Sequence, residues 1–81
     1  MNITIITEKL KEANLLDHKI EKFTFLINEK SEEQGAIFFV PAGGREYKFV
    51  LSAPFHKDII QDGETKSYKQ LLNHKQAILL K

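Results

Sequence analysis

The stretch from Gly35 to Ala53 constrains the fold of this chain more than any other, because it joins the densest apolar run to the clearest turn signal. Residues 36–40 are apolar at every position, which is typical of a central strand with apolar neighbours on both sides. Residues 46–51 place Tyr, Phe and Leu at every second position, the pattern of a strand with one buried face. Residues 41–44 supply a proline and two glycines suited to a turn. The stretch therefore predicts a β-hairpin.

The spacing within this hairpin predicts which side chains share a face of the sheet. If the loop has an even number of residues, Phe38 lies on the same face as Tyr47 and Phe49. Ile37 and Phe39 then point to the opposite side; an odd loop or a bulge would exchange the two sets, and both sets are apolar. We therefore expect an apolar outer face that the chain itself does not cover, which indicates an interface. The candidate partner interface consists of Leu26, Ile37, Phe39 and Val50.

Composition limits the architecture to one small domain, residues 1–81. A hydrophobic content of 42% suffices for one core of modest size, and the absence of cysteine excludes a disulfide framework. No apolar stretch approaches the roughly 20 residues that span a bilayer, and the N-terminal apolar segment is too short and too polar for a signal peptide. We therefore expect a soluble, cytoplasmic protein without a cofactor.

A helix is expected before the hairpin. Apolar residues at positions 3, 6, 10 and 13 recur at helical spacing, and they would place one apolar side against a core. Asn2 is a suitable N-cap, and Asn14 can close the helix in the left-handed conformation. Several residues between positions 2 and 7 are β-branched, which leaves a first strand in that segment as the alternative.

A further strand is expected between this helix and the hairpin. Residues 22–28 alternate in the manner of a strand with one buried side. The charged tract 29–34 predicts a solvent-exposed connection, so three consecutive strands would form an antiparallel meander with residues 36–40 in its middle. The side chains expected to extend the buried face of the hairpin are Phe23, Phe25 and Ile27.

After the hairpin the chain returns to helical periodicity. An Asp-Gly pair at 62–63 marks a turn. Ser67 and Gln70 have the spacing of a capping box, and the apolar stripe that follows predicts a helix from Ser67 or Tyr68 to Leu80. The predicted class is α+β with the order α-β-β-β-α, a three-stranded antiparallel meander with two helices packed on one face.

The sequence offers no catalytic or metal-binding signature. His18, His56 and His74 lie in different predicted elements and lack the spacing to other ligands that a metal site requires, so we expect all three at the surface. His56, beside Lys57 and Asp58, could act as a general base, but nothing in the sequence selects it for that role. We therefore expect a non-enzymatic protein with no metal site and no catalytic residue.

The basic start of the last predicted helix is the clearest binding signal. Residues 41–81 carry seven Lys and Arg against four acids, whereas residues 1–40 carry five Lys against seven acids. Lys66 and Lys69 flank the first turn of the helix, whose free N–H groups and dipole attract phosphate. With Asn73 they form a polar stripe of the kind that holds a nucleic-acid backbone without reading its sequence.

Two families are similar to this chain in element order and in short motifs. Residues 63–69, GETKSYK, resemble the glycine, lysine and serine pattern that opens the last helix of double-stranded-RNA-binding domains. This resemblance implies phosphate contacts by Lys66 and Lys69 and a capping role for Ser67. Residues 54–56, Pro-Phe-His, are similar to HicA-type toxins, which cleave messenger RNA, but the Gly-Ser-His that carries the catalytic histidine of that family is absent.

These observations lead to three hypotheses. In the first, the chain is a small RNA-binding module that uses Lys66, Lys69, Asn73, Arg45 and Lys48. In the alternative, it is a protein-binding adaptor or inhibitor, for example of a mobile element, whose apolar outer face contacts a protein partner or a second copy in a homodimer. The second alternative is a HicA-like ribonuclease toxin.

Overall fold

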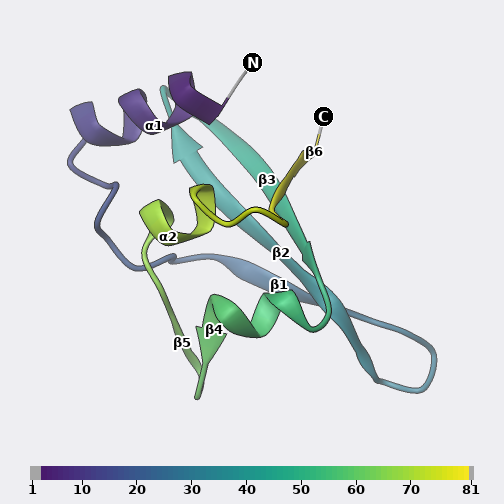
Figure 1. The fold of residues 1–81 in the computed structure, drawn as a ribbon. Helices are drawn as coiled ribbons and strands as arrows, with labels where there is room; N and C mark the ends of the chain where they lie inside the picture. The colour runs from purple at the N-terminus through teal and green to yellow at the C-terminus, as the bar shows by residue number, and fades with distance from the viewer. Residues whose placement is uncertain (1–2, 81) are drawn as a thin grey trace.

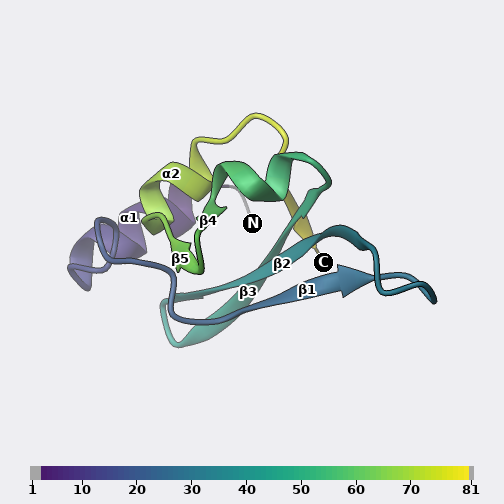
Figure 2. The same cartoon turned by 90° about the horizontal axis from the view of Figure 1, so that it is seen from below.

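The computed structural model describes residues 3–80 as an antiparallel sheet with the helices gathered on one of its sides (Figure 1; Figure 2). Four strands of the described chain form this sheet, in the spatial order β1 (Phe23–Ile27), β2 (Glu33–Ala42), β3 (Arg45–Ser52) and β6 (Ile78–Leu80). The α+β class and the meander with β2 in its middle are thus confirmed, and β6 adds a fourth strand to the sheet. None of the helices in this part of the chain is long and apolar enough to cross a bilayer.

The β2–β3 hairpin has a two-residue turn, and this even number fixes the two faces as predicted. Glycines at positions 43 and 44 form the turn with φ angles of 61° and 78°, a region that residues with a side chain rarely adopt. Phe38 pairs with Phe49, and both side chains are fully buried. Ile37 and Phe39 lie on the opposite face and are half-buried. The apolar outer face therefore exists.

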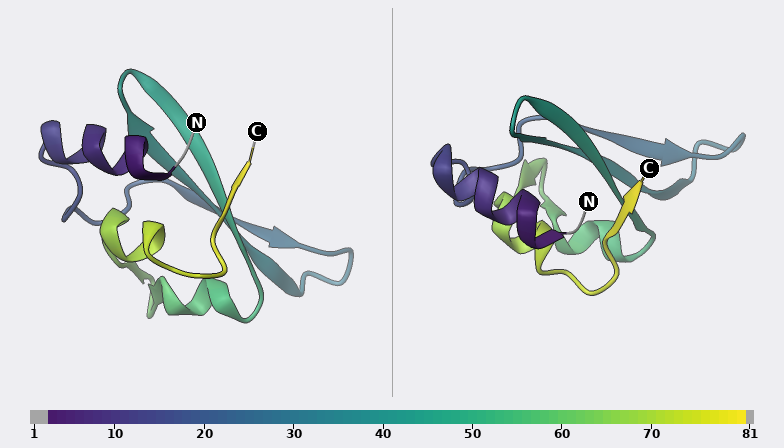
Figure 3. Two further views of the ribbon diagram at one scale, coloured as in Figure 1. Left: turned by 45° about the horizontal axis from the view of Figure 1, so that its top comes forward. Right: turned by 90° about the horizontal axis from the view of Figure 1, so that it is seen from above.

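β1 contributes less to the core than its alternation predicted. Phe23 packs against the core, but Phe25 is 43% exposed and Ile27 is 60% exposed, so the expectation that both extend the buried face is wrong. The end of β1 projects past the helices (Figure 3), and its pairing with β2 shifts between Leu26 and Ile27. β2 also begins at Glu33, inside the tract that was predicted to be a connection.

The first helix, α1 (Ile3–Glu12), confirms the helical prediction and excludes the strand alternative over the described part of that segment. Ile6 and Leu10 are fully buried one turn apart, which fixes the helix on the sheet. Asn14 has a φ of 58°, so the predicted left-handed residue after the helix is confirmed. The predicted N-cap, Asn2, lies outside the described residues.

The last helix, α2 (Tyr68–Leu72), is much shorter than predicted. The prediction that it continues to Leu80 is wrong. Its start is as expected: Gln70 N–H donates to Ser67 Oγ at 3.4 Å, and Ser67 N–H donates to Gln70 Oε1 at 3.0 Å, which completes the capping box. The chain then makes turns through residues 73–77 before it enters β6. Asn and His, two weak helix formers, occupy positions 73 and 74 and favour this early end.

β6 satisfies the edge of β3, which would otherwise present unpaired backbone groups. Leu79 pairs with Phe49 and packs inward against the core, whereas Ile78 and Leu80 point outward. Over a segment this short, the apolar pattern that predicted a helix fits an extended strand equally well. The unpaired edge of β3 therefore determines that the segment forms a strand. The helix prediction for residues 78–80 was wrong for this reason.

Short elements between β3 and α2 complete the layer that covers the sheet. They are the 3-10 helix η1 (Phe55–Asp58) and a small hairpin of β4 (Ile60–Gln61) and β5 (Glu64–Thr65). They lie on the same side of the sheet as α1 and α2 (Figure 2). The core fills the space between this layer and the inner face of the sheet. Its largest fully buried side chains are Phe38, Phe49, Ile6, Leu10, Leu51, Ile59, Leu71, His56 and Val40.

Candidate interaction surfaces

The outer face of the sheet is an apolar surface that no helix or strand within residues 3–80 covers (Figure 2; Figure 3). The four residues proposed from the sequence lie on this face and are half-buried, as the strand register requires. β6 enlarges the face at one edge, where Ile78 is 60% exposed and Leu80 is 38% exposed. We define the outer face by its apolar members, which are Leu26, Ile37, Phe39, Val50, Ile78 and Leu80.

Charged side chains border the outer face around Phe39. Lys22 Nζ lies 4.6 Å from the centroid of the Phe39 ring, and Lys48 Nζ lies 5.8 Å from it, so both ammonium groups make cation–π contacts. Lys22 also forms an exposed ion pair with Glu46 at 3.6 Å, which contributes roughly 0–1 kcal/mol. Phe39 therefore lies beside two charged side chains, an arrangement typical of the border between an apolar contact and its polar rim.

A basic hollow of about 750 Å³ lies where the chain after α1 folds back onto the start of α2. Lys66, Lys69 and Asn73 line it, so the structure brings these three predicted nucleic-acid-binding residues together. Lys19 lines the same hollow, and Lys11 of α1 lines two smaller hollows beside Lys69. We call the surface formed by Lys11, Lys19, Lys66 and Lys69 the lysine groove.

The sequence could not have identified Lys11 and Lys19 as members of this groove. Their position depends on contacts between segments that lie far apart in the chain, such as the backbone bridge between Lys19 and Ser67. Two of the predicted residues are absent from the lining of the hollow. Lys48 lies beside Phe39 on the outer face, and the Arg45 guanidinium lies 5.3 Å from the ring centroid of Tyr47 near the hairpin turn.

The first turn of α2 does not offer the free N–H groups that were expected to attract phosphate. Tyr68 N–H donates to His18 O at 3.1 Å, and Lys69 N–H donates to Leu16 O at 2.9 Å. The next N–H group belongs to the capping box already described. α2 has only five residues, so its dipole is also small. Any attraction of this surface for phosphate must therefore come from its lysine side chains.

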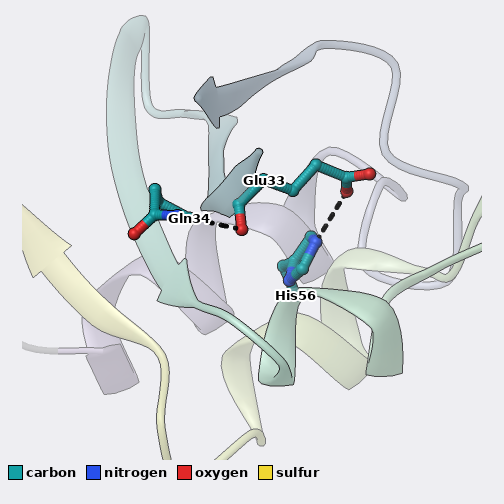
Figure 4. Close-up of polar contacts among 3 residues, drawn as sticks. All are labelled: Glu33, Gln34 and His56. Atoms are coloured by element: carbon teal, nitrogen blue, oxygen red, sulfur yellow. Dashed lines mark hydrogen bonds and ion pairs between the residues drawn. The ribbon is translucent and has the colours of Figure 1, made fainter. Parts of the chain in front are cut away.

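His56 is buried, which contradicts the expectation of a surface histidine. Only 1% of the residue is exposed, because η1 packs inward against the start of β2. Its Nε2 lies 2.8 Å from Glu33 Oε1 (Figure 4), and since an ionised carboxylate can only accept, Nε2–H is the donor. Its Nδ1 is buried without a hydrogen-bond partner among the described residues. In this position His56 fixes Glu33, and it is poorly placed to take a proton from a substrate.

His74 has a structural role, and His18 is exposed as predicted. His74 Nε2 lies 2.8 Å from Asp58 Oδ2, and its Nδ1 accepts the Gln76 N–H at 3.1 Å. Both ring nitrogens are thus used to hold η1 against the turn that leads into β6. Within residues 3–80, no group of three or more His, Asp and Glu side chains could hold a metal ion.

Comparison with protein-family models, curated proteins and solved structures gives no match.

Proposed function

We propose that this chain is a protein-binding module whose partner covers the outer face of the sheet. The observation that carries the proposal is the open apolar face, because soluble domains that expose a contiguous apolar patch commonly use it for association. The helices cover only the opposite side of the sheet (Figure 2), so nothing within residues 3–80 competes for this surface.

Burial of the outer face by a partner is energetically favourable. Complete burial of an apolar side chain contributes roughly 1.5–3 kcal/mol, and Ile78 and Leu80 still have much of their surface to bury. Phe39 offers a half-buried aromatic ring, the type of side chain that often dominates binding energy. Lys22 and Lys48 beside it favour acidic groups at the rim of the partner.

A capture experiment with matched variants tests this proposal. The tagged protein and its Ile78→Lys and Phe39→Lys variants are used to purify binding proteins from cells that naturally produce the chain. Ile27→Lys is the control, because Ile27 is also a strand residue with 60% exposure but points to the opposite side of the sheet. We expect one partner to be retained by the wild type and by Ile27→Lys, and lost from both outer-face variants.

Sedimentation of the purified protein extends this test to a second copy as the partner. A dimer that dissociates on Ile78→Lys identifies the partner as another molecule of this chain. If the protein is strictly monomeric and all variants capture the same proteins, the outer face is not a binding surface.

RNA binding through the lysine groove is the second candidate function. The supporting observation is the convergence of four lysines from three parts of the chain, with Asp17 as the one acid among the residues that line the hollow. If all four neutralise phosphates of single-stranded RNA, log K falls with log salt with a slope of about −3. Lys66→Glu with Lys69→Glu should abolish binding, whereas Lys30→Glu with Lys57→Glu, which changes the net charge equally, should weaken it little. Absence of binding at low salt eliminates this candidate.

A ribonuclease function finds the least support, because the one histidine that resembles the HicA motif is buried. An RNA-cleavage assay of the wild type against His56→Ala tests it directly: cleavage by the wild type that disappears in the variant would restore this hypothesis.

A further inference from the structure

A third surface lies on the side of the sheet opposite the outer face, between β1 and the elements that cover the sheet. It is a cleft of about 550 Å³ formed by the inner side of β1, the start of β2, η1 and the turn between β4 and β5. We call it the Phe25 cleft. Its side chains combine an aromatic ring, two carboxylates and polar groups from separate elements. The residues that line the cleft include Phe25, Glu33, His56, Lys57, Gln61 and Asp62.

The Phe25 ring is oriented by two neighbours and remains partly open. Its centroid lies 5.4 Å from that of Phe23 with an interplanar angle of 89°, and 6.2 Å from that of His56 with an angle of 87°. Edge-to-face contacts of this kind fix the direction of a ring. Phe25 nevertheless remains 43% exposed, although it points to the side of the sheet that carries the core. An aromatic face held open in this way attracts cations.

Glu33 supplies a carboxylate in a fixed position. Its Oε1 accepts the His56 Nε2–H at 2.8 Å (Figure 4), while 47% of its side chain is exposed. Its Oε2 has no hydrogen-bond partner in the described part of the chain, so it can accept from a ligand. His56 is almost fully buried, so it contacts Glu33 from the protein interior. Glu33 Oε2 is therefore left for a ligand in the cleft.

The hydrogen bond between His56 and Glu33 does not require a charged imidazole. A neutral His56 with its hydrogen on Nε2 donates to the carboxylate without adding charge. No Lys or Arg of residues 3–80 lies within ion-pair distance of Glu33. Among the side chains that line the cleft, Glu33 and Asp62 are acids and Lys57 is the one lysine. The cleft therefore carries a net negative charge.

We propose that the Phe25 cleft binds the guanidinium group of an arginine side chain from a protein partner. The guanidinium is planar, so it can stack on the open face of Phe25 while its N–H groups donate to Glu33 Oε2. Lysine carries the same charge but cannot stack as a plane. A nucleotide could stack on the same ring, but the excess of acids in the cleft would repel its phosphate. The site does not depend on the outer face or on the lysine groove.

An NMR titration of the ¹⁵N-labelled full chain tests this proposal. The probes are three blocked tripeptides, Gly-Arg-Gly, Gly-Lys-Gly and Gly-citrulline-Gly, together with guanosine monophosphate. Citrulline has nearly the shape of arginine and no charge, so it isolates the role of the cation. We expect the arginine peptide to shift the amide signals of Gln61 and Gly63, with an affinity about tenfold or more above that of the citrulline peptide. The lysine peptide should bind more weakly than arginine.

Variants connect the binding to the two named side chains. Glu33→Gln keeps an acceptor for His56 and removes the charge, and Phe25→Leu keeps an apolar group and removes the ring; each should weaken arginine binding about fivefold or more. Glu29→Gln removes the same charge from the neighbouring turn and should leave binding unchanged. Equal shifts from arginine and citrulline, stronger binding of guanosine monophosphate, or unaffected binding by Glu33→Gln would each overturn the proposal. The comparison of the peptides needs only the wild type, so it stands even if a variant fails to fold.

Discussion

Phe38 and Phe39 are adjacent in β2, yet the structure assigns them opposite energetic roles. Phe38 is fully buried against the helical layer, whereas Phe39 lies half-buried on the outer face beside two lysines. Replacement of each by Ala removes the same atoms from the same strand. The pair therefore provides a matched test of which side of the sheet carries the core.

The two substitutions should differ clearly in their effect on the free energy of unfolding. Phe38→Ala removes a buried ring and leaves a cavity, which costs about 3–5 kcal/mol. Phe39→Ala loses partial burial and exposed cation–π contacts of about 0.5–1 kcal/mol each, so we expect a cost of about 1–2 kcal/mol. A domain of this length has a total stability of roughly 4–12 kcal/mol. Phe38→Ala should therefore remove a large part of it, and Phe39→Ala a small part.

Urea denaturation followed by far-UV circular dichroism measures both effects. With a slope of about 1–2 kcal/mol per molar urea, the midpoints of the two variants should differ by about 0.5 M or more, with Phe38→Ala the lower. Equal midpoints, or a lower midpoint for Phe39→Ala, would refute the assignment of the faces and with it the existence of an open outer face.

Three further predictions concern the backbone, the cap of α2 and a buried phenol. Gly35 has a φ of 145°, and a Cβ there would overlap the carbonyl oxygen of Leu51, so Gly35→Ala should destabilise by about 2–3 kcal/mol in urea. Gly44→Ala, with no atom within 4 Å of the new Cβ, should cost only about 1 kcal/mol, and equal costs would contradict the role of the contact. Ser67→Ala should lower the free energy of unfolding by about 1 kcal/mol through loss of the capping box; an unchanged urea midpoint would show that the cap is dispensable. Burial raises the pKa of Tyr68 above its usual 10.0, so the unfolded chain releases this proton first, and stability should fall as the pH rises beyond about 10. The urea midpoint of Tyr68→Phe should fall less than that of the wild type between about pH 8 and about pH 10.5. An identical fall in both would contradict the role of Tyr68.

The arrangement of the hairpin was predictable because it depends on local rules. A two-residue turn of glycines fixes the pairing, and alternation along a strand then assigns every side chain to a face. The opposite positions of Phe38 and Phe39 follow directly from these rules. The left-handed Asn14 and the capping box of Ser67 and Gln70 are equally local, and the structure confirms both.

The errors concern features that depend on distant parts of the chain. The segment that ends at Leu80 forms a strand because β3 has an edge to satisfy, and nothing within the segment itself indicates this. His56 is buried because η1 turns inward, and its carboxylate partner Glu33 is 23 positions away. The same limit applies to Lys11 and Lys19, which reach the lysine groove only after the chain folds back.

Site-specific photo-crosslinking in cells that naturally produce the protein tests the central claim most directly. A benzoylphenylalanine replaces Ile78 on the outer face, Lys66 in the lysine groove, or Glu12 at an exposed position at the end of α1. We predict a discrete protein adduct from position 78 after irradiation, and none from position 12. An RNA adduct from position 66 with no adduct from position 78 would contradict the proposal and would favour RNA binding instead.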